Sequence, residues 1–246
     1  MQIDWLERKL FLKWRLQIYK CNLLSKGLFN TLLTNGRIDL MNTVLFVKAN
    51  DRGIEQAVSV KLYHAFLDSY KENHPDDSII ELDLFDEELP YMNANMINGI
   101  FKASRGMELT GDEQVSVEVS NKYMTQFLAA DKVVFGFPMW NRTVPAVLHT
   151  YMDYLNQVGK TFKYTAEGPI GLISDKKVAL LTARGGIYSG ESSGEMSYNY
   201  IRNNMLFFGV TEFEDVIVEG HDQYPDQAMG IITTGIVNAE KAAVDF

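Results

Sequence analysis

Short apolar runs alternate with segments of helical spacing from residue 41 onward, and this alternation constrains the fold more than any other feature. Runs of this kind suit strands that are covered on both faces. The runs are Thr43–Lys48, Ile79–Leu84, Lys132–Phe137, Lys177–Thr182 and Asp215–Glu219. Because strands that alternate with helices pair in parallel, the sequence predicts an α/β fold with a parallel sheet and helices on both faces.

The segments between these runs place apolar residues three or four positions apart, as one buried face of a helix requires. Val58, Leu62 and Phe66 show this spacing in the first of them. The predicted helices are Val58–Asn73, Glu113–Ala130, Pro145–Gln157, Tyr198–Phe208 and Pro225–Asp245. Residues 85–112 and 159–175 have weak periodicity, so we expect loops there, which at such lengths are usually lids, interface arms or disordered segments.

A parallel sheet binds ligands at the carboxyl ends of its strands, so the loops after the first, third and fourth predicted strands are the informative ones. The first loop runs into the helix that starts at Val58, and free amides at a helix start favour an anion such as phosphate. Asn50 and Ser59 add side-chain donors. The alternative is a solvated loop in which Ser59 only caps the helix. Neither a G-x-G-x-x-G nor a P-loop pattern occurs, which disfavours a Rossmann dinucleotide site and a nucleotide triphosphatase.

The other two loops offer a flat surface and a close approach. Pro138 stiffens the end of the third strand, and Met139, Trp140 and Asn141 then present an aromatic plane with hydrogen-bonding groups. The fourth strand ends in a pair of glycines at positions 185 and 186, which let backbone amides approach a ligand. Trp140 capping the core and a plain glycine turn are the alternatives. Together the three loops predict a flavin mononucleotide (FMN) site.

Composition narrows the class of protein. A formal net charge of -9 argues against nucleic acid as a partner, because a polyanion needs a basic face. No apolar run reaches the length of a membrane span. Cys21 is the single cysteine, so an intramolecular disulfide is impossible and a cytoplasmic location fits. Among the histidines we find no catalytic set, although His221 follows the fifth strand and could reach the edge of a ligand.

The first forty residues differ from the rest of the chain. They carry seven basic and three acidic side chains, a net +4, which leaves -13 for the remainder of a chain whose total is -9. We expect residues 1–40 to be an extension outside the functional fold, and the working domain to be 41–246, starting at Met41. A membrane-surface or partner-binding helix and a targeting segment are the alternatives.

Several stretches carry a family resemblance. Pro138–Asn141 reads PMWN and is followed by a threonine-valine-proline helix start, residues 159–172 read GKTFKYTAEGPIGL, and the fourth strand ends in ARGG. From Met41 to the C-terminus the chain resembles the FMN-dependent NADH:azoreductase family, which is flavodoxin-like and related to the quinone reductases. The GKTFKYTAEGPIGL segment is the most specific part.

The resemblance implies a five-stranded, doubly wound parallel sheet with the order 2-1-3-4-5. It implies a homodimer with active sites at the interface and one FMN per subunit. It also implies an enzyme that takes a hydride from NADH and reduces quinones and aromatic azo compounds by a ping-pong mechanism, cleaving the azo bond to two amines. The alternatives are a flavodoxin-like electron carrier without a substrate of its own and a flavin-free binding module.

The resemblance also assigns the site residue by residue. The residues that it places on the flavin, in chain order from the phosphate end to the pyrimidine edge, are Asn50, Ala57, Val58, Ser59, Pro138, Met139, Trp140, Asn141, Arg142, Ala183, Arg184, Gly185 and Gly186. It places Phe162, Tyr164 and Tyr188 in the substrate pocket, with the possibility that they reach across the dimer. Ala57 and Ala183 stand where relatives often have serine. Arg142 replaces an aromatic or aliphatic residue, and could either attract an anionic substrate or point into solvent.

Overall fold

The structure is a computed structural model that describes residues 41–189 and 195–246. Residues Asn42–Phe246 form one compact unit. The predicted extension, residues 1–40, lies outside the described residues, and both its status and the domain boundary at Met41 stay predictions.

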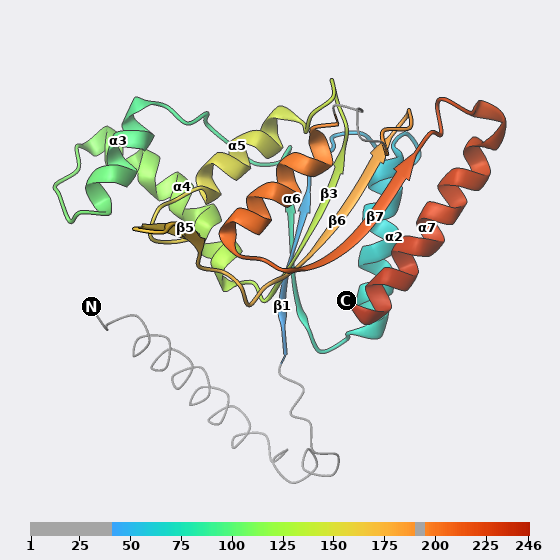
Figure 1. The fold of residues 1–246 in the computed structure, drawn as a ribbon, viewed down its shortest axis with the longest axis horizontal. Helices are drawn as coiled ribbons and strands as arrows, with labels where there is room; N and C mark the ends of the chain where they lie inside the picture. The colour runs from blue at the N-terminus through green and yellow to red at the C-terminus, as the bar shows by residue number, and fades with distance from the viewer. Residues whose placement is uncertain (1–40, 190–194) are drawn as a thin grey trace, which may run out of the picture. The chain divides into compact units, whose positions relative to one another are not determined.

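Five parallel strands form the central sheet (Figure 1). They are β1 (Thr43–Lys48), β2 (Ser78–Asp83), β3 (Lys132–Pro138), β6 (Lys177–Arg184) and β7 (Glu212–Glu219). The order is β2-β1-β3-β6-β7, which confirms the predicted 2-1-3-4-5 order. In the register of β3 and β6, Pro138 pairs with Ala183, so the carboxyl ends of these two strands lie side by side.

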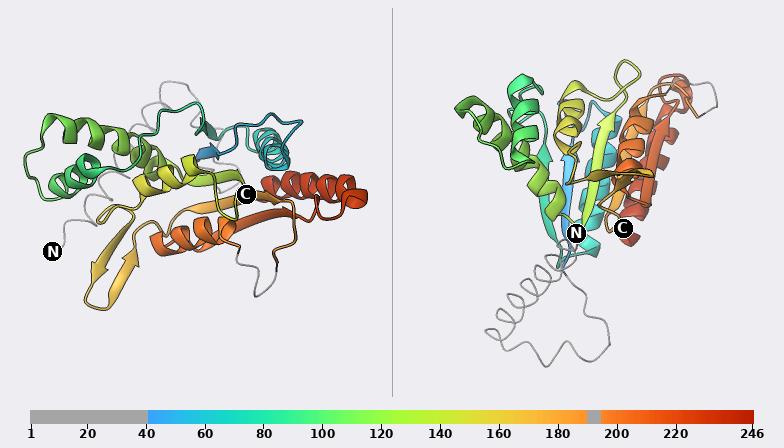
Figure 2. Two further views of the ribbon diagram at one scale, coloured as in Figure 1. Left: turned by 90° about the horizontal axis from the view of Figure 1, so that it is seen from above. Right: turned by 60° about the vertical axis from the view of Figure 1, so that its left-hand side comes forward.

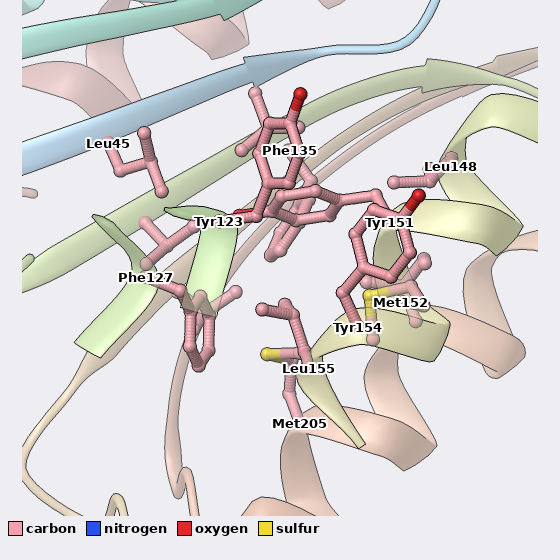
Figure 3. Packing of buried hydrophobic residues seen from close by; sticks show 14 of the residues in the cluster. Leu45, Tyr123, Phe127, Phe135, Leu148, Tyr151, Met152, Tyr154, Leu155 and Met205 are labelled. Carbon is pink, nitrogen blue, oxygen red and sulfur yellow. The ribbon is translucent and has the colours of Figure 1, made fainter. Parts of the chain in front are cut away.

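Helices cover both faces of this sheet, as predicted. On one face, α2 (Val58–Asn73) and α7 (Ala228–Asp245) pack side by side against Val44 and Phe46. On the other face, α4 (Gly111–Ala129), α5 (Ala146–Leu155) and α6 (Ser197–Phe208) pack against alternate residues such as Leu45 and Phe135. Figure 3 shows this second cluster, in which Tyr123, Tyr151 and Tyr154 lie among the aliphatic side chains.

Two regions predicted as loops contain regular structure. Within residues 85–112, Asn93 caps α3 (Ala94–Ala103) by accepting a hydrogen bond from the Met96 amide at 3.0 Å. Within residues 159–175, β4 (Phe162–Thr165) and β5 (Gly168–Gly171) pair as an antiparallel hairpin. This hairpin extends outward from the sheet in the left view of Figure 2. Both segments are largely exposed; the helical spacing of Met96, Ile100 and Phe101 was missed, and the four-residue strands are too short to show a period.

Several boundaries also differ from the predicted ones. β7 begins at Glu212 rather than Asp215, because two acidic residues obscure the start of this edge strand. The closing helix opens with a 3-10 turn at Pro225–Gln227 before α7 starts. α4 begins earlier than predicted, with a capping box between Thr110 and Glu113 in which the two reciprocal bonds measure 3.3 and 2.9 Å.

Candidate functional site

Loops from the carboxyl ends of the strands surround a cavity of about 430 Å³. It lies where the sequence predicted a ligand, since its walls come from the loops after β1, β3 and β6, with further residues after β7 and on α7. The predicted site residues that line it are Asn50, Ala57, Val58, Ser59, Pro138, Met139, Trp140, Ala183, Arg184 and Gly185. Asn141, Arg142 and Gly186 do not line it.

The start of α2 forms one end of the cavity. Ala57 is the N-cap residue and provides no side-chain hydrogen bond, and the first turn of this 16-residue helix holds no acidic residue. The amides of Val58 and Ser59 therefore have no hydrogen-bond partner among the described residues. Such amides, together with the helix dipole, favour an anion.

Two buried side chains fix this end of the cavity. The Asn50 amide nitrogen donates to Ser59 Oγ at 3.0 Å, and the Asn50 oxygen accepts from the Arg52 amide at 3.0 Å. Asn50 and Ser59 are each 2% exposed. Ser59 therefore does not cap α2, so the alternative of a solvated loop in which Ser59 is only a helix cap is wrong. Because its hydroxyl accepts from Asn50, its proton remains available to a ligand.

The turn after β3 forms the flat wall. Trp140 and Thr143 exchange backbone hydrogen bonds of 2.9 and 3.0 Å, which closes a tight turn with Asn141 and Arg142 at its centre. Both central residues have positive φ, 50° and 69°. A hairpin turn of this kind suits asparagine and glycine, whereas arginine there is unusual. Trp140 is half-buried and lines the cavity, so it does more than cap the core.

Gly185 lies against the side chain of Asp222. A β-carbon added at Gly185 would lie 2.2 Å from Oδ2 of Asp222, which also lines the cavity. Arg184 precedes it, and its Nε donates to Glu219 Oε2 at 2.9 Å, while its Nη1 lies 3.5 Å from Glu195 Oε1. Neither carboxylate lines the cavity. The guanidinium of Arg184 therefore anchors the loop. Other atoms of this residue line the cavity.

The carboxyl group of Glu219 is ionised in this setting. Burial works to raise its pKa, but the Ser189 hydroxyl, the Tyr188 amide and the Arg184 guanidinium together outweigh burial and hold the pKa below its usual range. A carboxylate that accepts several hydrogen bonds keeps its charge at neutral pH, so this anchor of the loop is charged under ordinary conditions.

Further residues line the cavity that the sequence did not single out. They are Arg52, Glu55, Gln56, Lys61, Asp222 and Ile232. The first three lie in the loop after β1, where the position of the loop was a usable signal. Ile232 comes from α7, and no signal in the sequence pointed to it. His221 lines the cavity too, in agreement with its predicted place near a ligand edge, and its Nδ1 is buried without a partner among the described residues.

The predicted substrate residues lie outside this cavity. Phe162 is 6% exposed and packs on Phe207 with ring centroids 4.5 Å apart, whereas Tyr164 beside it is 68% exposed. Tyr188 is half-buried, and its ring lies next to Gly186. Their role in binding a substrate stays a prediction.

The cavity fits a phosphorylated aromatic ligand such as FMN. Uncapped amides at the start of α2 suit a phosphate, Trp140 offers a plane, and Gly185 permits a close approach. In the part of the chain that the structure describes, no group of histidine, cysteine, aspartate or glutamate could hold a metal ion. Within the same residues, every helix is too short or too polar to cross a membrane.

Known proteins share both the sequence and the fold. The profile of a family described as flavodoxin-like fold matches residues 42–241. FMN-dependent NADH:quinone oxidoreductase 4 of Bacillus cereus (strain ZK / E33L) is 62% identical over 208 residues, which cover 84% of this chain and 100% of the relative. FMN-dependent NADH:quinone oxidoreductase 1 of Bacillus subtilis (strain 168) is 55% identical with the same coverage.

Solved structures agree with these relatives. The crystal structure of azoreductase from Bacillus anthracis str. Sterne matches with a TM-score of 0.82 and 62% identity, covering 84% of this chain and 100% of the other. An FMN-dependent NADH-azoreductase from Bacillus anthracis str. Ames Ancestor, solved in complex with FMN, matches with a TM-score of 0.74 and 28% identity over 83% of this chain and 99% of the other. The chain therefore belongs to the flavodoxin-like family and, within it, to the FMN-dependent NADH:quinone oxidoreductases and azoreductases that its sequence resembles.

Proposed function

We propose that this protein is an FMN-dependent oxidoreductase that takes a hydride from NADH and reduces quinones and aromatic azo compounds by a ping-pong mechanism. One observation carries the proposal: the loops after β1, β3 and β6 meet around a single cavity that offers uncapped helix amides, an indole and a glycine. Relatives at 62% identity are named for FMN, NADH and quinone or azo substrates.

The chain's own residues bind and orient the cofactor. The amides of Val58 and Ser59 hold its phosphate, and the hydroxyl of Ser59 donates a further hydrogen bond. Met139 and Trp140 set the plane of the ring. When bound, FMN supplies the two-electron redox chemistry that no side chain of this site offers. This division agrees with the absence of a catalytic set from the sequence.

Charge on the ring is stabilised by backbone groups. The Gly185 amide lies at the end of β6 on the wall of the cavity and has no hydrogen-bond partner among the described residues. Preorganised N–H donors lower the energy of a negatively charged state without having to reorient during the reaction. The protein thus contributes position and electrostatics.

We further propose a homodimer with an active site at each of two interface positions. The hairpin β4–β5 supports this, because Tyr164 and Ile170 are 68% and 45% exposed and lie outside the cavity that one chain builds. A second chain would cover these apolar side chains and bring a hairpin to each site. Light scattering coupled to gel filtration measures the mass, and a mass of one chain at micromolar concentration would contradict the dimer.

We propose the cytoplasm as the location. A single cysteine, Cys21, fits a reducing compartment. Fractionation of the source cells with an antibody against the protein tests this, and recovery in the medium or with membranes would contradict it.

The visible absorption spectrum tests the proposed function. We expect the purified protein to be yellow, and to bleach in one two-electron step when NADH is added without oxygen. Quinone or azo dye should then restore the colour. A colourless protein that takes up no added FMN would contradict the proposal and favour a binding module. A yellow protein that NADH leaves unchanged would point to an electron carrier.

A further inference from the structure

A single carboxylate gathers the donors of the glycine loop. Glu219, the last residue of β7, accepts from Arg184 Nε at 2.9 Å and from the Tyr188 amide at 3.0 Å. It also accepts from the hydroxyl of Ser189. These donors flank Gly185 and Gly186 on both sides, so one side chain holds the two ends of the loop that follows β6.

The segment after β7 adds a second set of bonds to the same loop. The Gly185 carbonyl accepts from the Asp222 amide and from the Gln223 amide, each at 3.0 Å. The Gln223 side chain in turn accepts from the Ile187 amide at 2.9 Å. The glycine loop is therefore fixed through its backbone by residues that arrive from the neighbouring strand.

These bonds occupy some backbone amides of the loop and leave others without a partner among the described residues. The amides of Ile187 and Tyr188 are occupied by Gln223 and Glu219. Those of Gly185 and Gly186 have no hydrogen-bond partner among the described residues. Since the Gly185 position lines the cavity, its amide is available to a ligand there. Two amides thus hold the loop in place, and two amides remain unbonded.

We propose that Glu219, assisted by Gln223, is a positioning residue that holds the glycine loop so that the amide of Gly185 meets the polar edge of bound FMN. This inference rests on the proposed function. Glu219 does not line the cavity, so it acts through the loop.

The charge of Glu219 is part of this arrangement. Arg184 is 6% exposed and lies between Glu219 and Glu195, whose carboxylate accepts from the amides of Tyr198 and Asn199 at the start of α6. A neutral amide at position 219 could still accept from Arg184 and from the Tyr188 amide through its oxygen, but these bonds would lose the assistance of the charge, and its NH2 group would face the Ser189 hydroxyl. The loop would then lose part of its anchor without losing volume.

Glu219→Gln in the full-length chain is the test. We expect the dissociation constant of FMN, measured by fluorescence titration of chain freed of flavin, to rise about tenfold, as the loss of charge-assisted bonds predicts. The midpoint potential of the bound flavin should become more negative, because the amides then favour the more negatively charged form less. Glu212→Gln is the matched control, since Glu212 is exposed at the far end of β7, and neither quantity should change.

Gln223→Leu guards against a variant that does not fold, because Gln223 is exposed. We expect a smaller rise in the FMN dissociation constant, about threefold, with the same sign of change in potential. Wild-type affinity and potential in both variants would overturn the inference while leaving the proposed function standing. If wild-type chain itself bound no FMN, the proposed function would fail first. A loss of thermal stability with unchanged potential would mark Glu219 as merely structural and also overturn the inference.

Discussion

The two ends of the central sheet are built in opposite ways. At the amino ends, the residue directly before each of four strands is polar and paired; these residues are Asn42, Asp77, Asp131 and Lys176. At the carboxyl ends, amides of Val58, Ser59, Gly185 and Gly186 have no partner among the described residues. The same strands therefore carry a closed end and an open end.

Asp77 shows how completely the amino end is closed. Its carboxylate accepts from the Asn42 amide at 2.7 Å and from the Tyr70 hydroxyl at 2.6 Å, and Lys132 lies 3.8 Å away. Burial of Tyr70, and then its bond to Asp77, raise the pKa of the Tyr70 hydroxyl far above its usual range. The phenol therefore remains a donor at any ordinary pH, and the cluster stays satisfied.

The comparison separates stability from binding. A buried cluster in which each group is paired stabilises the fold, and breaking it leaves charges without partners. A loop with open amides adds little to stability but can bind a ligand. We expect variants at the amino end to change the free energy of unfolding with little effect on FMN affinity, and variants at the carboxyl end to do the reverse.

Asp77→Ala should give the largest effect. It leaves the Tyr70 hydroxyl without its acceptor and removes the carboxylate 3.8 Å from Lys132, and we expect the free energy of unfolding to fall by about 3 kcal/mol. Urea unfolding measures it, and Asp76→Ala is the control, since Asp76 is exposed and adjacent. FMN affinity of the folded variant should match that of wild type. A loss of affinity as large as the loss of stability would break the separation between the two ends.

Gly185→Ala should act at the other end. The new β-carbon would lie 2.2 Å from Oδ2 and 3.0 Å from Cβ of Asp222, so Asp222 or the loop must shift, and we expect FMN affinity to fall roughly tenfold. Gly186→Ala meets its nearest atom, on Tyr188, only at 3.2 Å and should cost less. Titration with FMN measures both. If the double variant Gly185→Ala/Asp222→Gly did not regain affinity, the steric explanation would be wrong.

The sheet could be predicted because its central strands bury most of their side chains and α2 buries one face at helical spacing. Thr43–Lys48 and Val58–Asn73 agree with β1 and α2 residue for residue. α3 buries only Met96 and Gly99, although Met96, Ile97, Ile100 and Phe101 have helical spacing, so the prediction missed a ten-residue helix whose pattern was present. The four-residue strands β4 and β5 are stabilised by pairing with each other. Hydrophobic periodicity in the sequence does not reveal such pairing.

The site was predictable to the extent that loops at strand ends define it. Those after β1, β3 and β6 were found because parallel sheets bind at this edge. The anchoring of the glycine loop was not, since Arg184 and Glu219 lie 35 positions apart in the chain. Ile232 reaches the cavity from α7, and only the packing of that helix brings it there.

Acid should weaken the closed end through Asp77 once the pH falls below the usual range of an aspartate. Burial works to raise the pKa of this carboxyl, but bonds from Tyr70 and Asn42 and the charge of Lys132 outweigh it and hold the pKa below the usual 3.8. A carboxylate with a lowered folded pKa contributes stability that is present above 3.8 and is lost as the pH falls through the folded value.

The difference in unfolding free energy between wild type and Asp77→Asn should therefore narrow as the pH is lowered from neutrality to below 3.8. Other carboxylates titrate in both proteins and cancel in this difference. The change is smaller than that for Asp77→Ala, because protonation keeps the side chain in place. A difference that stayed constant over this range would show that Asp77 is not the titrating group.

The turn after β3 should give the smallest effect, and it tests whether the open end stores strain. Arg142 has a φ of 69°, a conformation that glycine adopts more easily than any residue with a β-carbon. Arg142→Gly and Arg142→Ala both remove the side chain and its contacts, so their difference reports the backbone alone. We expect the glycine variant to be more stable by about 0.5 kcal/mol, because relief of the left-handed strain exceeds the added entropy of the unfolded chain. Urea unfolding of the two variants measures the difference. Equal stabilities would mean that this turn is not left-handed in solution. Backbone strain would then not distinguish the carboxyl end of the sheet from the amino end.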